Sequence, residues 1–394
     1  MWWESIRWAL RFITYFSLAT FRKNLVKLNL SITSVCNSRC QTCDIWKEPK
    51  RSAATDFTLA DYESLFQNTP KSVCWLSITG GEPFLRADLA PILRSAAHHL
   101  PRLSLLSITT NGLDSYRPVE VVRELLESVP QMRIYLNISL DGKAELHDTL
   151  RGMPGNFFAA TYLRRNLKSL QATARQRLKV TYETTVTTAN EGEVARIAEF
   201  AQQTDTLHIV TLGRKSPFYR HAENSSKLKT LFLETENAAN FLANHLKQIP
   251  IRIGFDHVVR RALYVGGMLF YRRAGKHPVA CVAGKNSVVI GAKGLVTPCV
   301  HWSVPLGTVG SSHSLRSILA NEKTKSIVTK IRAQACPGCW TPCEATQSLL
   351  ASPLKCILFA MESLKMRNRK LRKPNFWPTP PIFPIPKLVR DYFF

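Results

Sequence analysis

The 394-residue sequence is poor in acidic residues, with 28 Asp and Glu against 53 Lys and Arg, and its formal net charge is therefore +25. It also lacks a clean membrane-spanning run. A spanning helix needs about 20 largely uncharged residues, and Arg7 and Arg11 interrupt the apolar stretch 1–21. No cleavable signal peptide is recognisable. Together with ten cysteines, these absences predict a reducing, cytoplasmic location and anionic partners, either nucleic acid or a membrane surface.

Both ends of the sequence carry apolar segments beside basic residues. The segment 1–25 is rich in Trp, Phe and Leu, and the segment 347–394 combines an apolar helix, expected over 348–364, with a basic cluster and a tail rich in Pro and aromatic residues. Such patterns are typical of attachment to an anionic lipid surface, so we expect a peripheral protein on the cytoplasmic face of a membrane. The alternatives are a first helix that packs across an open side of the main domain and a basic tail that wraps around it.

Between 26 and 215, apolar strands alternate with helices. The six strands are expected near 28–32, 73–79, 103–109, 133–140, 179–188 and 207–212. Helix starts are predicted at Thr58, where Asp61 completes a capping box, at Pro118, and beside Asn190 and Glu193. Six strand–helix units in series predict an α/β fold, a partial (β/α)6 TIM-type barrel, whose chemistry lies at the carboxyl ends of the strands.

Three cysteines follow the first strand with the spacing C-x3-C-x2-C, namely Cys36, Cys40 and Cys43. Three thiolates on one loop can hold three irons of a [4Fe–4S] cube and leave the fourth iron without a protein ligand. A disulfide staple, a zinc knuckle and scattered structural cysteines are the alternatives. A staple is typical of small secreted chains and structural zinc takes four ligands, so the spacing favours the cluster.

Polar motifs follow the next three strands. They are Gly80, Gly81, Glu82 and Pro83 after the second strand, Asn111 after the third, and Ser139 and Asp141 after the fourth. Two glycines let backbone approach a ligand closely, and Glu82 can accept a hydrogen bond from an ammonium group. Ser139 and Asp141 suit ribose or carboxylate contacts. Each motif alone would be an ordinary turn, but their shared position at strand ends predicts one site.

With these motifs in this order, the chain resembles the radical SAM superfamily over 26–213. The resemblance implies a [4Fe–4S] cluster on the three loop cysteines and S-adenosylmethionine, whose amino group the loop 80–83 would hold. It also implies that the reduced cluster passes one electron to the sulfonium, and that the resulting 5′-deoxyadenosyl radical takes hydrogen from an unactivated C–H bond. A reductant such as flavodoxin or ferredoxin is the implied partner.

A second cysteine-rich region spans 277–346, after a helical connector expected over 216–276. A hairpin is expected over 286–297, turning at Lys293 and Gly294, and a helix over 314–332. The cysteines around these elements are Cys281, Cys299, Cys336, Cys339 and Cys343. A zinc ribbon, which also takes four cysteine ligands, is the alternative. With the upstream motifs, the region resembles the SPASM/twitch extension, which implies one auxiliary [4Fe–4S] cluster with the ligands Cys281, Cys299, Cys336 and Cys339, and Cys343 as the alternative ligand.

The substrate is predicted from weaker signals. Sulfatase-maturing members of the group carry an aspartate directly after the cysteine that matches Cys299, and Val300 at this place counts against that activity. His301 follows and is a candidate base, with a structural histidine as the alternative. The terminal segments favour a membrane-proximal, lipid-linked or saccharide substrate, and a peptide is the alternative.

Two other classes of protein are alternatives to an enzyme. A nucleic-acid-binding protein would rest on charge alone, because the barrel region lacks a basic stripe interleaved with aromatic residues, and we expect no nucleic-acid partner. A scaffold that only holds clusters is disfavoured, because the three loop cysteines and Glu82 are all present.

Overall fold

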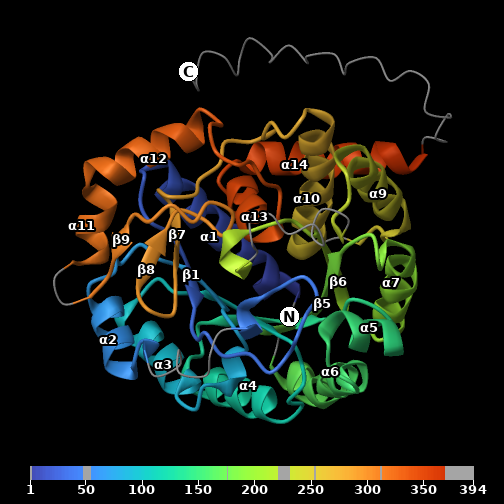
Figure 1. The fold of residues 1–394 in the computed structure, drawn as a ribbon, viewed down its shortest axis with the longest axis horizontal. Helices are drawn as coiled ribbons and strands as arrows, with labels where there is room; N and C mark the ends of the chain where they lie inside the picture. Colours follow the sequence, from blue (N-terminus) through green and yellow to red (C-terminus); the bar gives the residue numbers. More distant parts are fainter. Residues whose placement is uncertain are drawn as a thin grey trace.

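The computed structural model describes residues 2–47, 55–174, 176–220, 231–252, 254–310 and 313–368 (Figure 1). The strands of these ranges form one sheet in the order β6-β5-β4-β3-β2-β1-β7-β8-β9. The first six strands are β1 (Lys27–Ser31), β2 (Trp75–Thr79), β3 (Leu105–Thr110), β4 (Arg133–Ser139), β5 (Leu178–Val186) and β6 (Leu207–Leu212). Each is parallel to its neighbours, which confirms the predicted fold class.

Helices cover the outer face of this sheet (Figure 1). They are α2 (Leu59–Gln67), α3 (Leu89–His99), α4 (Arg117–Ser128), α5 (Ala144–Arg151), α6 (Asn156–Thr173) and α7 (Val194–Gln203). Apolar side chains at alternate strand positions, such as Leu28, Leu76 and Ile134, are fully buried against these helices. Because successive side chains of a strand point to opposite faces, the intervening residues face the inside of the curved sheet.

The predicted hairpin is confirmed, and it extends the same sheet. Its strands are β7 (Ser287–Ile290) and β8 (Leu295–Thr297), followed by β9 (Gly307–Thr308). β7 pairs in parallel with β1, while β8 and β9 are antiparallel. The turn between β7 and β8 places Gly294 at a φ of +80°, where its N–H donates to the carbonyl oxygen of Gly291 at 2.9 Å. The hairpin therefore lies directly beside the first strand of the barrel.

Four details of the predicted helices are corrected. The helix expected over 314–332 is two helices, α11 (Leu315–Ala320) and α12 (Glu322–Arg332), because Asn321 caps α12 by accepting the backbone N–H of Thr324 at 2.7 Å. The apolar helix expected over 348–364 is likewise divided into α13 (Pro342–Leu350) and α14 (Pro353–Asn368), since a residue before proline disfavours helical backbone.

The other two corrections concern α5 and α7. The short helix α5 was not predicted. Asn190 and Glu193 make no side-chain cap at the start of α7. Asn190 instead donates to the backbone carbonyl oxygen of Asp141 at 2.7 Å, and so it supports the turn after β4.

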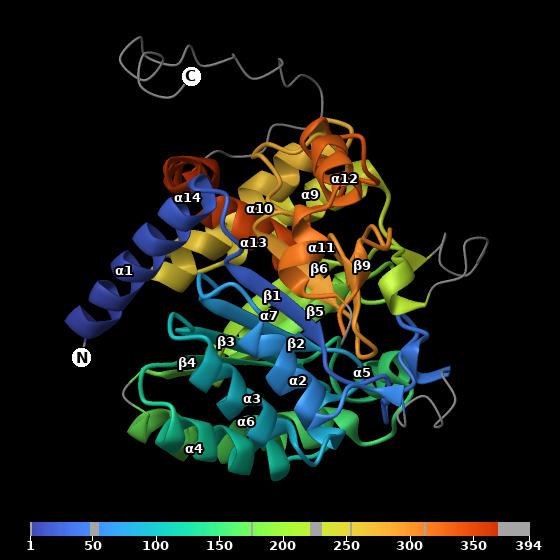
Figure 2. The ribbon, with the colours of Figure 1, turned by 90° about the vertical axis from the view of Figure 1, so that its left-hand side faces the viewer.

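Helix α1 (Trp2–Phe21) lies across the amino ends of the strands, as the packing alternative predicted. Phe16 is fully buried with its ring 6.4 Å from that of Trp75, the first residue of β2, and the guanidinium of Arg133, the first residue of β4, lies 4.3 Å from the ring of Trp8. Figure 2 shows α1 and α14 side by side, on the opposite side of the sheet from the loop that follows β1.

The remaining helices, α9 (Thr235–Gln248) and α10 (Phe255–Arg272), pack against each other and share a second apolar core with α1, α13 and α14. Among the described residues, no helix is long and apolar enough to cross a membrane. The basic and aromatic tail from 369 to 394 lies outside the described residues.

Candidate functional site

The three cysteines of the first motif lie half-buried on the loop between β1 and α2, and none is in a disulfide. Asp56 holds the start of this loop, because its carboxylate accepts hydrogen bonds from the Thr33 hydroxyl and from the backbone and hydroxyl of Ser34, at 2.8–2.9 Å. The loop is therefore fixed before the first cysteine.

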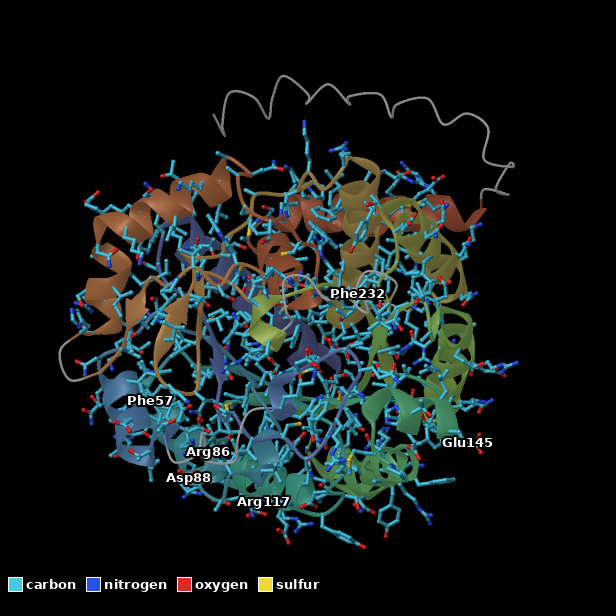
Figure 3. The ribbon with its side chains drawn as sticks, viewed as in Figure 1. Phe57, Arg86, Asp88, Arg117, Glu145 and Phe232 are labelled. Atoms are coloured by element: carbon cyan, nitrogen blue, oxygen red, sulfur yellow. The ribbon has the colours of Figure 1, made fainter. Side chains whose placement is uncertain are left out.

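Arg86 holds the same part of the loop from another direction (Figure 3). Its guanidinium donates to the carbonyl oxygens of Ile32 and Phe57 at 3.0 and 2.8 Å, and it is paired with Asp88 at 2.7 Å. Because Arg86 follows the Gly80–Pro83 motif, this contact joins the second motif to the base of the cysteine loop.

The two glycines of the second motif face the cysteine loop itself. The backbone N–H of Gly81 donates to the carbonyl oxygen of Thr33, and that of Glu82 donates to the carbonyl oxygen of Val35, each at 2.8 Å. The two backbone segments therefore pair as neighbouring strands do. A Cβ atom at Gly81 would lie 1.8 Å from the carbonyl oxygen of Val35, so no larger residue fits there. These contacts explain the glycines by the approach of two backbone segments, whereas the sequence suggested the approach of a ligand.

Glu82 is buried and its carboxylate is held by β3. Oε1 accepts the hydroxyl of Thr110 and Oε2 the backbone N–H of Asn111, both at 2.8 Å. Burial raises the pKa of Glu82 to about 7, although these hydrogen bonds act to lower it. The carboxylate thus has a fixed orientation, and its hydrogen bonds do not fully offset the cost of burying its negative charge.

Asn111 links β3 to the cysteine loop. Its side-chain amide donates to Asn37 Oδ1 at 2.7 Å and to Ser38 Oγ at 2.9 Å, between the first and second cysteines. The side chain of Asn156 in turn donates to the carbonyl oxygen of Asn111 at 2.9 Å. The described contacts of Asn111 are therefore those of a residue that positions the loop.

The fourth motif forms a buried ion pair that the sequence did not reveal. Asp141 accepts the backbone N–H of Thr185 at 2.7 Å, and its other oxygen lies 2.7 Å from Nε of Arg151. Arg151 also directs Nη1 toward the sulfur of Cys40 at 3.7 Å. Burial acts to lower the pKa of Arg151, but the Asp141 carboxylate and the nearby thiolates outweigh burial and raise it. Ser139 is buried two residues before Asp141.

Helix α5 carries Arg151 and is bound to the cysteine loop through its backbone. Arg39 and Gln41 donate their N–H groups to the carbonyl oxygens of Arg151 and Leu150 at 2.9 and 2.8 Å. Gly152 ends the helix at a φ of +62°, and a Cβ there would lie 2.5 Å from the carbonyl oxygen of Arg39. The only sequence signal for this contact is the Arg-Gly pair itself.

The second group of cysteines lies where the loop before β7, the loop after β8 and the start of α13 meet. Cys299 and Cys339 are buried, and the other three are half-buried. Burial raises the pKa of Cys339, and the thiolates of Cys299, Cys281 and Cys343 raise it further, which places these sulfurs near one another. The Cys336 thiolate likewise contributes to the raised pKa of Cys281.

No three His, Cys, Asp or Glu side chains of the described residues are grouped tightly enough to hold a single metal ion. The ligands of a cube are bound to different irons, so their sulfurs are held farther apart than the ligands of one ion.

A buried lysine and glutamate lie between this group and the barrel. Nζ of Lys27, the first residue of β1, donates to the carbonyl oxygen of Cys343 at 2.8 Å. Burial lowers the pKa of Lys27, and Glu344 and the Cys343 thiolate act against that change. Burial raises the pKa of Glu344 to about 7, and Lys27 opposes the rise. Neither residue was selected from the sequence.

The inner face of the sheet is polar near the carboxyl ends of its strands. Ser77 and Ser107 are paired neighbours on β2 and β3, and Asn137 on β4 accepts the hydroxyl of Thr181 at 2.7 Å. Glu183 on β5 accepts the hydroxyl of Thr211 on β6 at 3.1 Å, and burial raises the pKa of Glu183. Most of these side chains are half-buried, so hydroxyl, amide and carboxylate groups face the inside of the barrel.

His301 is buried, with Nε2 3.1 Å from the hydroxyl of Thr341. Burial lowers the pKa of His301 to about 3, and the positive charge of Arg214 contributes. The ring is therefore neutral at physiological pH. Its contact supports the structural alternative, and its role as a base stays a prediction.

Two family patterns match the chain. The Radical SAM superfamily matches residues 30–201, and the SPASM iron–sulfur cluster-binding domain matches residues 281–343. The first range contains the cysteine loop and the motifs at the ends of β2, β3 and β4. The second begins at Cys281 and ends at Cys343.

Curated relatives match part of the chain. A GTP 3′,8-cyclase of Pasteurella multocida is 28% identical over 148 residues, which are 35% of this chain and 42% of the cyclase. A probable GTP 3′,8-cyclase of Thermococcus kodakarensis is 27% identical over 232 residues, 55% of this chain and 69% of that protein. The Fe-coproporphyrin III synthase of Methanosarcina barkeri is 27% identical over 218 residues, 52% and 50% of the two chains. The chain thus spans less than half of the length of the first relative.

Solved structures share the fold over nearly the whole chain. Native anSMEcpe with bound AdoMet and the Cp18Cys peptide has a TM-score of 0.55 at 17% identity, and the match covers 87% of this chain and 99% of that chain. The same protein with the Kp18Cys peptide gives a TM-score of 0.57 at 16% identity and the same coverage.

The residues present fit the cofactors of this fold. Within the described residues, the loop between β1 and α2 is held by the ends of β2 and β3 and by α5, and its thiols are Cys36, Cys40 and Cys43. Three thiols are the ligand set of a cube with one open iron. Burial raises the pKa of Cys36 to about 11, so iron ligation would supply the positive charge that the thiolate needs. The radical SAM domain brings S-adenosylmethionine and this cluster, and the second domain brings auxiliary iron–sulfur ligation. The chain is therefore a member of the radical SAM superfamily with a C-terminal SPASM iron–sulfur domain.

Proposed function

We propose that the chain binds S-adenosylmethionine at the Cys36, Cys40 and Cys43 cluster and uses it to abstract hydrogen from an unactivated C–H bond. When bound, the cluster and S-adenosylmethionine supply one-electron reduction and a carbon radical that removes hydrogen. The observation that carries the proposal is the position of the three thiols at the carboxyl ends of the strands, on a loop fixed by β2, β3 and α5. A flavodoxin or ferredoxin is the class of donor that would supply the electron.

The chain's own residues bind and orient the cofactors. The Gly80–Pro83 loop would receive the methionyl amino group, and Glu82 would balance its charge, since its Oε2 keeps a lone pair beyond the one that accepts the backbone N–H of Asn111. Arg151 compensates negative charge at Cys40 while it holds Asp141 in place. Ser139 and Asp141 are proposed to contact the ribose or the carboxylate.

We further propose one auxiliary [4Fe–4S] cluster with the ligands Cys281, Cys299, Cys336 and Cys339, and Cys343 as the alternative ligand. Cys299, Cys281 and Cys343 all act to raise the pKa of Cys339, and Cys281 acts to raise that of Cys299, which supports one common site for these sulfurs. Cys343 lies beside the barrel, because its carbonyl oxygen accepts a hydrogen bond from Nζ of Lys27, the first residue of β1, at 2.8 Å.

The substrate class that we propose is a membrane-proximal saccharide or lipid-linked saccharide. The hydroxyl, amide and carboxylate groups on the inner face of the sheet support a substrate with many polar groups. The exposed apolar side chains of α1 and α14 support a location near a lipid surface. The names of the relatives, two cyclases of GTP and a coproporphyrin synthase, differ too much to support one substrate.

The reaction is tested with anaerobically reconstituted protein, dithionite and S-adenosylmethionine. We expect 5′-deoxyadenosine from the wild type and none from the C36A/C40A/C43A variant. Cys356→Ala is the matched control, since Cys356 lies buried in α14 and its loss should leave the product unchanged. A wild-type protein that binds the cluster and forms no 5′-deoxyadenosine would refute the proposal.

The substrate class is tested with fractions of cells grown in deuterated medium. The fraction that contains the substrate should transfer deuterium into 5′-deoxyadenosine, which mass spectrometry measures. We expect transfer from the lipid-linked saccharide fraction or the soluble saccharide fraction. Transfer from the peptide fraction alone would establish the peptide alternative instead.

A further inference from the structure

We propose that the outer faces of α1 and α14 form one surface that docks on an anionic phospholipid bilayer. The proposal concerns binding alone and does not depend on the proposed reaction.

The outer face of α1 carries four exposed large apolar residues. Trp3, Leu10, Leu18 and Phe21 have exposed fractions of 72%, 60%, 51% and 83%. Their spacing of seven, eight and three residues places them along one side of the helix, opposite the buried Phe12 and Phe16. Arg7, Arg11 and Thr14 are exposed on the same side, so this face combines apolar and basic residues, as in helices that lie at a membrane interface.

The outer face of α14 has the same character. Its exposed apolar residues are Leu354, Ile357, Leu358, Met361 and Leu364, each with an exposed fraction between 40% and 59%. They recur at intervals of three and four residues, which is the pattern of a single helical face. Cys356 and Ala360 form the opposite, buried face.

The two faces meet at one groove. Ile6, Leu10 and Ile13 of α1 and Pro353 and Ile357 of α14 line it, with a volume of about 570 Å³. Leu10 and Ile357 are exposed on its two sides, so the two sets of apolar residues face each other across a groove that Arg133, Lys179 and Asp256 also line. Figure 2 shows the two helices together at the same edge of the molecule. Contiguous apolar surface of this kind marks an interaction site.

Charge selects an anionic bilayer as the occupant. The exposed cations beside the apolar residues are Arg7, Arg11, Arg22 and Lys23 on and just after α1, and Lys355 and Lys365 on α14. The acidic residues of the two helices are Glu4 and Glu362, and the latter is paired with Lys365 at 3.5 Å. A second copy of this chain would bring the same positive charges to the contact and be repelled. Anionic headgroups would neutralise them while the apolar side chains enter the interfacial region.

The test is co-sedimentation of the full chain with vesicles of phosphatidylcholine alone or of phosphatidylcholine with phosphatidylglycerol. We expect binding to the anionic vesicles and at least tenfold weaker binding to the neutral ones. The Leu10→Glu/Ile357→Glu variant should lose at least tenfold in binding to the anionic vesicles. Phe158→Glu/Tyr162→Glu is the matched control, because it makes the same change of charge at exposed aromatic residues of α6 and should bind as the wild type does.

Other outcomes would overturn the proposal. Equal binding by both double variants would assign lipid binding to another part of the chain. A dimeric wild type that becomes monomeric in Leu10→Glu/Ile357→Glu would assign the surface to a second copy. A variant with a lower free energy of unfolding than the wild type but with equal binding to the vesicles would assign the surface to the residues after 368. If Leu10→Glu/Ile357→Glu fails to fold, Trp3→Ser/Leu358→Ser tests the same surface without added charge.

Discussion

Arg151 connects three parts of the site, because it pairs with Asp141, lies beside Cys40 and accepts the backbone N–H of Arg39. Replacing it with Ala would leave the carboxylate of Asp141 buried without a cation. We expect Arg151→Ala to lower the free energy of unfolding by about 3–5 kcal/mol, measured by chemical denaturation of the apoprotein.

The control for this prediction is Arg151→Lys, which keeps the charge and loses the fork of the guanidinium. Compared with Arg151→Ala, it should recover part of the lost free energy of unfolding. It should recover a smaller part of the iron bound at the cysteine loop. If Arg151→Ala unfolds at the same denaturant concentration as the wild type, the ion pair contributes little to the fold.

Residues of this kind were the hardest to predict from the sequence. Cys36, Cys40 and Cys43 were found because the signal lies in their spacing, and Glu82 because it lies beside two glycines. Arg86 and Glu183 carry no local signal, and Arg151 carries only the glycine that follows it. Each becomes part of the site only through partners far along the chain, such as Ile32, which is 54 residues from Arg86.

At the scale of elements, the contact of α5 with the cysteine loop depends on a glycine. Gly152 and Gly155 both have positive φ, at +62° and +80°, so replacing either with Ala has a cost in backbone conformation of about 1–2 kcal/mol. A Cβ at Gly152 would also meet the carbonyl oxygen of Arg39 at 2.5 Å, whereas one at Gly155 would meet nothing within 4 Å. We expect Gly152→Ala to be the more destabilising of the two and to lower the iron bound per chain.

Gly155→Ala is the control for that prediction, and it should keep the iron content of the wild type. Equal loss of iron in both variants would mean that backbone strain alone, and no contact with the cysteine loop, explains the effect. Iron is measured colorimetrically after anaerobic reconstitution.

Most elements were predictable because their signals are local. The six strands alternate apolar and polar residues, and Thr58 and Asp61 form the capping box that their spacing predicted. Helix α5 was missed because its eight residues are too few for a clear periodic pattern. Asn190 was misassigned as a cap because its partner, the carbonyl oxygen of Asp141, lies 49 residues away. The parallel pairing of β7 with β1, which places Lys27 opposite Ser287, spans a still longer part of the chain.

At the scale of the whole molecule, two separate groups of cysteines predict two clusters. The reconstituted wild type should hold about eight irons per chain and C36A/C40A/C43A about four. The remaining irons should be lost from a variant that lacks Cys281, Cys299, Cys336 and Cys339. Four irons in the wild type, with zinc at the second group, would contradict the auxiliary cluster.

The protein should also lose stability in acid through buried neutral histidines. Burial lowers the pKa of His245 to about 3, and that of the adjacent His208 is lowered by burial and by His245. The unfolded chain binds a proton on His245 below about pH 6.5, and the folded chain binds it only near pH 3. Between these values the free energy of unfolding should therefore fall by about 1.4 kcal/mol per unit of decreasing pH for this residue.

His245→Phe tests this dependence, since Phe keeps a ring against Phe241 and Tyr264. Denaturation midpoints of the wild type and the variant should converge as the pH is lowered from 6.5 toward 4. Parallel curves would show that the imidazole is protonated in both states.

The position of α1 across the amino ends of the strands determines how far the reacting carbon of a substrate must stand from lipid. β1 has five residues, and at about 3.3 Å per residue the cysteine loop begins roughly 17 Å beyond the end that α1 covers. If the outer face of α1 rests on the bilayer, the mouth of the barrel opens toward water. An acyl chain would not reach the site from within the membrane, whereas a long sugar headgroup or a freely diffusing molecule would.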